Sequence, residues 1–237
     1  SGEWIQCAVL RTGGPSQLND LVDFKRKSDR SKKTFITNLK KDEGKLDPES
    51  GMDYWSSGVS AISKSFKGNS LQPLFYKKKE LIKKYETALH RKTKIMHIRN
   101  IEIINTYSQM NSKHWKPDKN VKFEAVSRSN FIMNIEGINI KMRPSVIFTF
   151  NLSDTYQVGG VWFVSQKDGF EKNELCMFCD VLYKYLKINY SEKYEISNSY
   201  CTAVDVLKGY DINYQELIKN SMESILHSNI EEMKSLF

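Results

Sequence analysis

The chain has 237 residues, of which 40% are hydrophobic and 27% are charged, a balance that excludes wholesale disorder. Four cysteines are too few for a disulfide-built scaffold, no run approaches the ~18 apolar residues of a membrane span, and residues 1–4 lack signal-peptide features. We therefore expect a soluble, cytoplasmic protein whose net charge of +8 favours an acidic partner.

The positive charge is concentrated in one segment of the chain. Residues 51–120 carry 14 Lys and Arg against 5 Asp and Glu, a net charge of +9. Residues 121–237 carry 12 against 15, a net charge of −3. This asymmetry favours one defined electropositive surface over diffuse solubilising charge.

The first fifty residues contain few hydrophobic anchors. Residues 4–10 (WIQCAVL) predict a short strand that is ended by the turn residues 12–15. Residues 16–50 have weak periodicity, so we expect a long, partly ordered connector with one short strand at residues 34–37. Pro48 stands where the first turn of a helix tolerates a missing N–H, which predicts a helix start.

A helix is predicted next from the spacing of its apolar residues. Trp55, Val59, Ile62 and Phe66 recur at intervals of four, three and four, which places them on one helix face. Residues 68–70 (GNS) are expected to end this helix.

A second, longer helix is predicted from Leu71 to Tyr107. Apolar residues recur from Phe75 to Ile103 with no Pro or Gly between them, so we expect a continuous helix that packs antiparallel to the first. Its opposite face is dense in basic residues, namely Lys77, Lys78, Lys79, Lys83, Lys84, Arg91, Lys92 and Lys94.

Several cations on one rigid face, with aromatic residues between them, are typical of nucleic-acid binding. Phe75, Tyr76 and Tyr85 are interleaved with the lysines. A solvated helix face, an acidic protein partner and a membrane surface remain alternatives for the same pattern.

The character of the chain changes after a predicted linker at residues 111–119. The segments expected to form strands are 123–126, 131–135, 138–150, 158–165 and 199–207, and those expected to form helices are 173–190 and 213–237. Glu136-Gly137 predicts a hairpin turn. The order predicts an α+β (mixed α/β) fold, with a basic, mainly helical region at residues 1–115 and a mixed-sheet domain at 116–237.

Other motifs are better explained by structure than by chemistry. Cys176 and Cys179 form a CxxC inside a predicted helix, without the second pair that a zinc site needs. His90 and His97 are seven residues apart, whereas two metal ligands on one helix are usually four apart. Gly159-Gly160 lies inside a strand and predicts close approach of another backbone.

Three short motifs carry a resemblance to a known fold: Arg143-Pro144-Ser145, Gly159-Gly160-Val161-Trp162 and Val204-Asp205-Val206. With them, residues 121–237 resemble an uncharacterised group of bacterial proteins that is similar to the PD-(D/E)XK nuclease core. In that core, strand acids hold a metal ion and a lysine assists. Ser145 and Trp162 stand where the resemblance implies an acid and the lysine, so it implies the fold with its chemistry lost.

We therefore expect a non-catalytic, nuclease-like protein of a bacterial phage-defence or mobile-element system that binds nucleic acid without a cofactor. The first alternative is a metal-dependent nuclease that uses Glu136, Asp154 and Asp205 with Mg²⁺ or Mn²⁺. The second is a subunit whose basic helix docks an acidic protein partner. The sequence leaves open DNA or RNA, sequence specificity and oligomeric state.

Overall fold

The computed structural model describes residues 16–41, 54–125, 132–136, 138–152 and 154–236. Its helices and its mixed sheet form an α+β fold, as predicted. The chain divides into two compact units. The sheet unit comprises Tyr54–Val126 and Pro144–Glu223, and the terminal unit comprises Ser1–Asp53, Ser127–Arg143 and Ser224–Phe237. The boundary expected at residue 115 lies within the sheet unit.

The sheet unit is organised around five strands in the order β1-β4-β5-β6-β7. Their bounds are β1 Lys122–Glu124, β4 Val146–Leu152, β5 Thr155–Val164, β6 Glu195–Asp205 and β7 Tyr210–Asn213. Only the β5–β6 pair is parallel among these neighbours. The strand expected at residues 158–165 corresponds to β5, which is central in this sheet and buried from Val158 to Val164.

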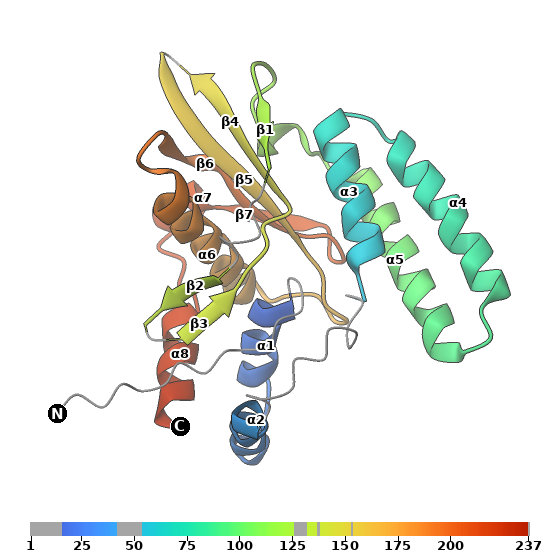
Figure 1. The fold of residues 1–237 in the computed structure, drawn as a ribbon, viewed down its shortest axis with the longest axis vertical. Helices are drawn as coiled ribbons and strands as arrows, with labels where there is room; N and C mark the ends of the chain where they lie inside the picture. Colours follow the sequence, from blue (N-terminus) through green and yellow to red (C-terminus); the bar gives the residue numbers. More distant parts are fainter. Residues whose placement is uncertain (1–15, 42–53, 126–131, 137, 153, 237) are drawn as a thin grey trace. The chain divides into compact units, whose positions relative to one another are not determined.

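Helices cover both faces of this sheet because successive β5 side chains point to opposite sides (Figure 1). Trp162 packs edge-on against Phe178 of α6 (Lys172–Tyr190), with ring centroids 5.6 Å apart. Phe163 packs on the other face against Phe66 of α3 (Ser56–Gly68), at 5.7 Å. The position of α3, and of the helices that follow it, is thus set by the sheet core.

The predicted continuous helix from Leu71 to Tyr107 is wrong. The chain forms α4 (Gln72–Thr87) and α5 (Arg91–Gln109), and the residues that flank Leu89 between them have extended backbone. A single helix of that length would extend about 55 Å and leave its apolar face largely uncovered. Folding back allows α3, α4 and α5 to pack together and to bury residues that include Leu81 and Ile103.

Two other predicted segments of the C-terminal half are each divided in the structure. The expected strand 138–150 is two strands, because the segment around Pro144, which has no N–H for a ladder, separates β3 (Ile138–Lys141) from β4. The expected helix 213–237 is α7 (Tyr214–Lys219) followed by α8 (Leu226–Ser235). Asn213 caps α7, since its side chain accepts the Glu216 N–H at 2.9 Å.

The terminal unit contains α1 (Ser16–Lys25), α2 (Asp29–Lys41), the antiparallel pair β2 (Ile132–Ile135) and β3, and α8. Within the described residues 16–41, the expected connector and the strand expected at residues 34–37 are wrong, because α1 and α2 occupy most of this stretch. Leu18, Leu21 and Val22 are fully or almost fully buried and give α1 its apolar face. The strand expected at residues 4–10 and the helix start expected at Pro48 lie outside the described residues.

Close packing at Gly159 confirms the expectation of a backbone approach and generates a first prediction. A Cβ at this position would lie 2.6 Å from the Tyr200 carbonyl oxygen, at the register shift between β5 and β6. Gly159→Ala should therefore lower the free energy of unfolding by about 1–3 kcal/mol, measured by urea denaturation.

Gly68→Ala is the matched control, because a Cβ there meets no atom within 4 Å. Since Gly68 is in the last turn of α3, this change should leave stability unchanged or raise it by up to about 1 kcal/mol. Equal effects of the two substitutions would contradict the proposed steric cause.

Candidate nucleic-acid interface

Helices α4 and α5 form an antiparallel pair that we call the basic hairpin, residues 72–109. It contains nine Lys and Arg against three Glu, a net charge of +6. All eight predicted contact residues lie on it, five on α4 and three on α5. The structure thus brings them onto one hairpin, although the single helix that was expected to carry them does not exist.

The cations of the basic hairpin do not form one uniform stripe. Glu80 lies between Lys77 and Lys84, with Oε–Nζ distances of 2.6 and 2.7 Å. Hydrogen bonds from Lys77 and then from Lys84 lower the pKa of Glu80 to about 2. The carboxylate therefore stays ionised at neutral pH and neutralises part of the charge that the sequence assigned to this face.

Three further cations contact neighbours on the hairpin. Lys78 donates to the Asn105 side-chain oxygen at 2.8 Å, which links α4 to α5. The Lys79 ammonium lies 5.3 Å from the centroid of the Phe75 ring, and that of Lys94 lies 5.5 Å from the Tyr85 ring. Such cation–π contacts hold the ammonium groups in place without neutralising them.

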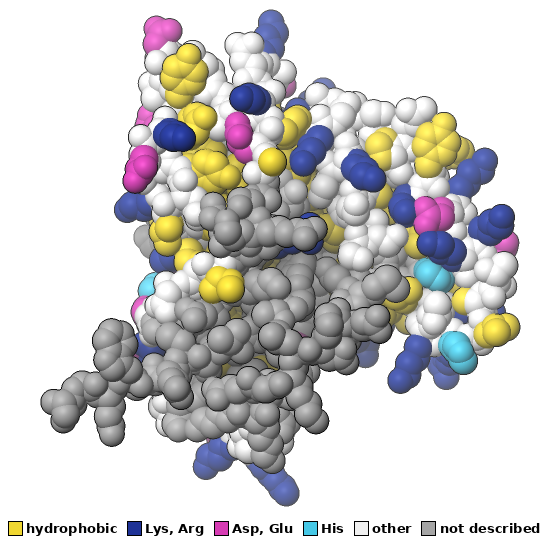
Figure 2. Space-filling model, viewed as in Figure 1, with side chains coloured by type: hydrophobic (Ala, Val, Ile, Leu, Met, Phe, Trp, Pro, Cys, Tyr) yellow, Lys and Arg dark blue, Asp and Glu magenta, His cyan; other side chains and the backbone are white. Residues whose placement is uncertain are grey.

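Lys83, Arg91 and Lys92 are exposed, and their side chains make no hydrogen bond or ion pair within the described parts of the chain. The hairpin also has exposed hydrophobic residues. The most exposed of these is Leu89, at the turn of the hairpin, with 93% of its surface accessible. Figure 2 shows basic and hydrophobic side chains together on the surface that the helices form. Free cations on an exposed surface can contact the phosphates of a nucleic acid.

The histidines of the hairpin have different surroundings. His97 is buried, and burial lowers its pKa below the ordinary value, so it is neutral at pH 7 and adds no charge. His90 precedes α5 and is exposed. His97 lies within the helix packing and His90 lies in solvent, so the two histidines do not share a helix face.

Asp205, the strand acid of the nuclease resemblance, is fully buried at the end of β6. One of its carboxylate oxygens accepts the Phe170 N–H at 2.8 Å, and the other accepts the N–H groups of Leu207 and Lys208 at 2.9 and 3.0 Å. Burial raises the pKa of Asp205, and these hydrogen bonds oppose the rise. The carboxylate thereby closes the loop after β6 and ties it to the segment before α6.

Asp154 and Asp205 lie at opposite ends of the central strands. Asp154 is in the turn before β5, in the left-handed region at φ 66°, whereas Asp205 pairs with Val164 at the far end of β5. Ten strand residues separate these ends by about 30 Å. The two acids therefore cannot share a metal ion.

Glu136 belongs to the terminal unit, in the turn between β2 and β3. His227 contacts one of its carboxylate oxygens, and the Lys234 ammonium lies 3.4 Å from the other. The hydrogen bond from His227 is the main reason why the pKa of Glu136 is lowered. This acid, like Asp205, has a local structural partner.

The other positions of the resemblance also have structural roles. The Ser145 hydroxyl accepts the Phe163 N–H at 3.0 Å and so connects the start of β4 to β5. Trp162 is completely buried against α6. Cys176 and Cys179 are buried within α6, as expected for packing residues, and burial raises the pKa of Cys176 to about 11.

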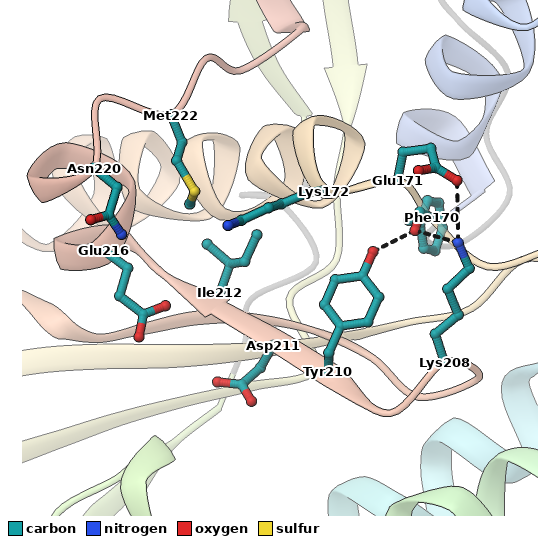
Figure 3. A pocket seen from close by; sticks show the side chains of 10 residues that line it. All are labelled: Phe170, Glu171, Lys172, Lys208, Tyr210, Asp211, Ile212, Glu216, Asn220 and Met222. Atoms are coloured by element: carbon teal, nitrogen blue, oxygen red, sulfur yellow. Dashed lines mark hydrogen bonds and ion pairs between the residues drawn. The ribbon is translucent and has the colours of Figure 1, made fainter.

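A cavity of about 540 Å³ lies beside the loop that Asp205 closes (Figure 3). Lys172, from the start of α6, points into the space between Ile212 and Met222. The Tyr210 hydroxyl and the Lys208 ammonium instead donate to the Phe170 carbonyl oxygen. No sequence pattern indicated this cavity, because β7 and the end of α7, which form two of its walls, were not predicted.

Comparison of the chain with protein-family models, curated proteins and solved structures finds no match. Among the described residues, no helix combines the length and the apolar character that a membrane crossing requires. The same residues contain no group of three His, Cys, Asp or Glu with the spacing of a metal site.

The contacts of Asp205 predict a large loss of stability when its carboxylate is removed. Asp205→Ala leaves the buried N–H of Phe170 and the partly buried N–H groups of Leu207 and Lys208 without this acceptor, so it should lower the free energy of unfolding by about 3 kcal/mol. Asp205→Asn retains one acceptor oxygen and should cost roughly half as much. Urea denaturation followed by circular dichroism measures both.

Asp154→Asn is the matched control, because it makes the same chemical change in an exposed turn and asparagine tolerates the left-handed conformation. It should leave stability within about 0.5 kcal/mol of the unmodified chain. If Mn²⁺ stabilised the unmodified chain but not Asp205→Asn, Asp205 would be a metal ligand and the structural assignment would be wrong.

Proposed function

We propose that this protein binds nucleic acid through the basic hairpin, as a non-catalytic, nuclease-like component of a bacterial defence or mobile-element system. The observation that carries the proposal is the net charge of +6 on residues 72–109, with Lys83, Arg91 and Lys92 exposed and, among the described residues, free of acidic partners. A polyanion is the partner class that neutralises such a surface most completely.

The chemistry of these cations favours phosphate contacts over base recognition. Seven of the nine are lysines, whose ammonium groups are point charges on flexible stems. Contacts of this kind position a protein on the nucleic-acid backbone and carry little sequence information. The proposed binding is therefore weak in sequence preference and strongly dependent on salt.

An acidic protein partner is the second candidate function, favoured by the exposed Leu89 and Ile82 beside the cations. Apolar contacts of this kind would make binding less sensitive to salt than phosphate contacts alone. A metal-dependent nuclease that uses Glu136, Asp154 and Asp205 is not favoured. Asp154 and Asp205 lie at opposite ends of β5, and Glu136 is held by His227 and Lys234. Salt titration and a cleavage assay with Mg²⁺ or Mn²⁺ distinguish the three functions.

The proposed function predicts a characteristic dependence on salt. If six phosphates are neutralised, a plot of log affinity against log salt concentration should have a slope of roughly −4 to −5. Lys83→Glu with Lys92→Glu removes two contacts, so the slope should become shallower by about 1.5. Fluorescence anisotropy with labelled DNA and RNA oligonucleotides measures the slopes.

Lys187→Glu with Lys193→Glu is the control, because both lysines are exposed and lie on α6 or just after it, away from the hairpin. This variant has the same net charge as the test variant and should retain most of the original slope. An equal reduction in both variants would mean that net charge, not the hairpin, governs binding. No retention of either nucleic acid at low salt would contradict the proposed function.

The ion pairs of Glu80 predict a variant with increased affinity. Glu80→Gln removes the charge that neutralises Lys77 and Lys84, so it should tighten binding about fivefold. This factor corresponds to ~1 kcal/mol, the repulsion in water between a carboxylate and a phosphate about 4 Å apart. Loss of these exposed pairs should cost less than about 1 kcal/mol of stability.

Glu192→Gln is the matched control, because Glu192 is exposed in the turn after α6. It changes the net charge equally and should leave affinity nearly unchanged. If Glu80→Gln bound no more tightly than Glu192→Gln, Lys77 and Lys84 would not contact phosphates.

A further inference from the structure

We infer that the nucleic acid bound by the basic hairpin is single-stranded, and that its unpaired bases stack on Phe75 and Tyr76 of α4. This inference rests on the proposed function and names its substrate class. It applies to single-stranded DNA and RNA alike, because both present unstacked bases between phosphates.

The first argument is the exposure of these two rings. Phe75 is 58% exposed and Tyr76 is 61% exposed, although both lie on a helix whose apolar contacts with its neighbours are made by Leu74 and Leu81. The rings are therefore on the solvent side of α4 and are not needed for packing of the helices. Two adjacent exposed aromatic residues form an apolar surface that a ligand can cover.

The second argument is the mutual geometry of the rings. Their centroids are 5.9 Å apart with an interplanar angle of 67°. In this edge-to-face arrangement the rings do not stack on each other, so a face remains available for a flat ligand. A nucleobase stacks on such a face whatever its identity, because every base has a π-face.

The third argument is the placement of cations beside the rings. The Lys79 ammonium lies over Phe75, one helical turn further along α4, and Lys83 follows after one more turn. Four residues advance about 6 Å along a helix axis, so Lys79 and Lys83 place cations at about 6 Å intervals along α4 after the Phe75 ring. A base on the ring and a phosphate on the ammonium can therefore belong to the same strand.

A cavity at the start of α4, one helical turn before Phe75, offers space for the continuing strand. Leu71, one turn before Phe75, lines a cavity of about 430 Å³, a size within the usual range of ligand sites. The same cavity is lined by Asn69, Ser70, Ser112 and Lys113, which supply amide, hydroxyl and ammonium groups. These groups can hydrogen-bond to the base edges and phosphates of a single strand. In a duplex the base edges are already paired, and the duplex is too wide for its phosphates to enter the cavity.

A comparison of single strands with duplexes tests the inference. Binding of labelled 12-mers of dT and of U should be tighter than binding of a 12-bp DNA duplex at the same salt concentration. Phe75→Ala with Tyr76→Ala should weaken single-strand binding at least fivefold, since base stacking on an aromatic side chain contributes about five- to more than a hundredfold per base. Duplex affinity and the salt slope should remain unchanged, because no cation is removed.

Two variants control for loss of an aromatic residue in general. Tyr156→Ala removes an aromatic residue that is 65% exposed on β5, and it should leave single-strand affinity unchanged. Phe75→Trp should retain or tighten single-strand binding, because the larger ring preserves the stacking surface. Circular dichroism should show native helix content in all variants, since the substituted side chains are more than half exposed.

The possible outcomes distinguish failure of this inference from failure of the proposed function. Absence of binding to single strands and duplexes alike overturns the proposed function, and the inference with it. Salt-dependent binding in which duplexes bind as tightly as single strands overturns the inference alone. The same conclusion follows if Phe75→Ala with Tyr76→Ala leaves single-strand affinity unchanged.

Discussion

The central strand β5 must be covered on both faces, and the rest of the sheet unit depends on this constraint. Alternate residues of the strand point to opposite sides, so Trp162 requires an apolar partner on one face and Phe163 on the other. Helix α6 provides the first and α3 the second. Because α4 and α5 pack on α3, the basic hairpin receives its position from the sheet core.

Asp205, the acid to which the sequence resemblance drew attention, lies at the end of β6 and makes structural contacts there. A strand acid at the end of a parallel pair is well placed for chemistry in many α/β proteins. Here both carboxylate oxygens are occupied by backbone N–H groups that close the loop after β6. A metal ion would have to displace these hydrogen bonds, and the acids proposed as its further ligands lie elsewhere.

Sequence patterns predicted the elements whose burial is regular and missed those decided by tertiary contacts. The α3 stripe and the apolar run of β5 are periodic, so both were found. The break at Leu89 was missed because Ala88-Leu89-His90 contains no Gly or Pro. The turn is stabilised by the packing of α4 and α5 against α3, which the local sequence does not show. Strand β7 was missed because its four residues gain stability mainly from pairing with β6. For the hairpin, composition showed where the cations are concentrated, but it could not show that Glu80 neutralises two of them.

Charge and aromatic surface have different consequences on the basic hairpin. Cations act at a distance and with little geometric demand, so they determine how strongly any polyanion is held and how salt weakens it. Stacking requires contact with an exposed ring face, so in the proposed complex Phe75 and Tyr76 are the residues that would discriminate between unpaired and paired bases. Substitutions in the two groups should therefore act independently, the lysine changes altering the salt slope and the aromatic changes altering the preference for single strands. Because the Lys79 ammonium contacts the Phe75 ring, a substitution of Lys79 should alter both the salt slope and the preference for single strands.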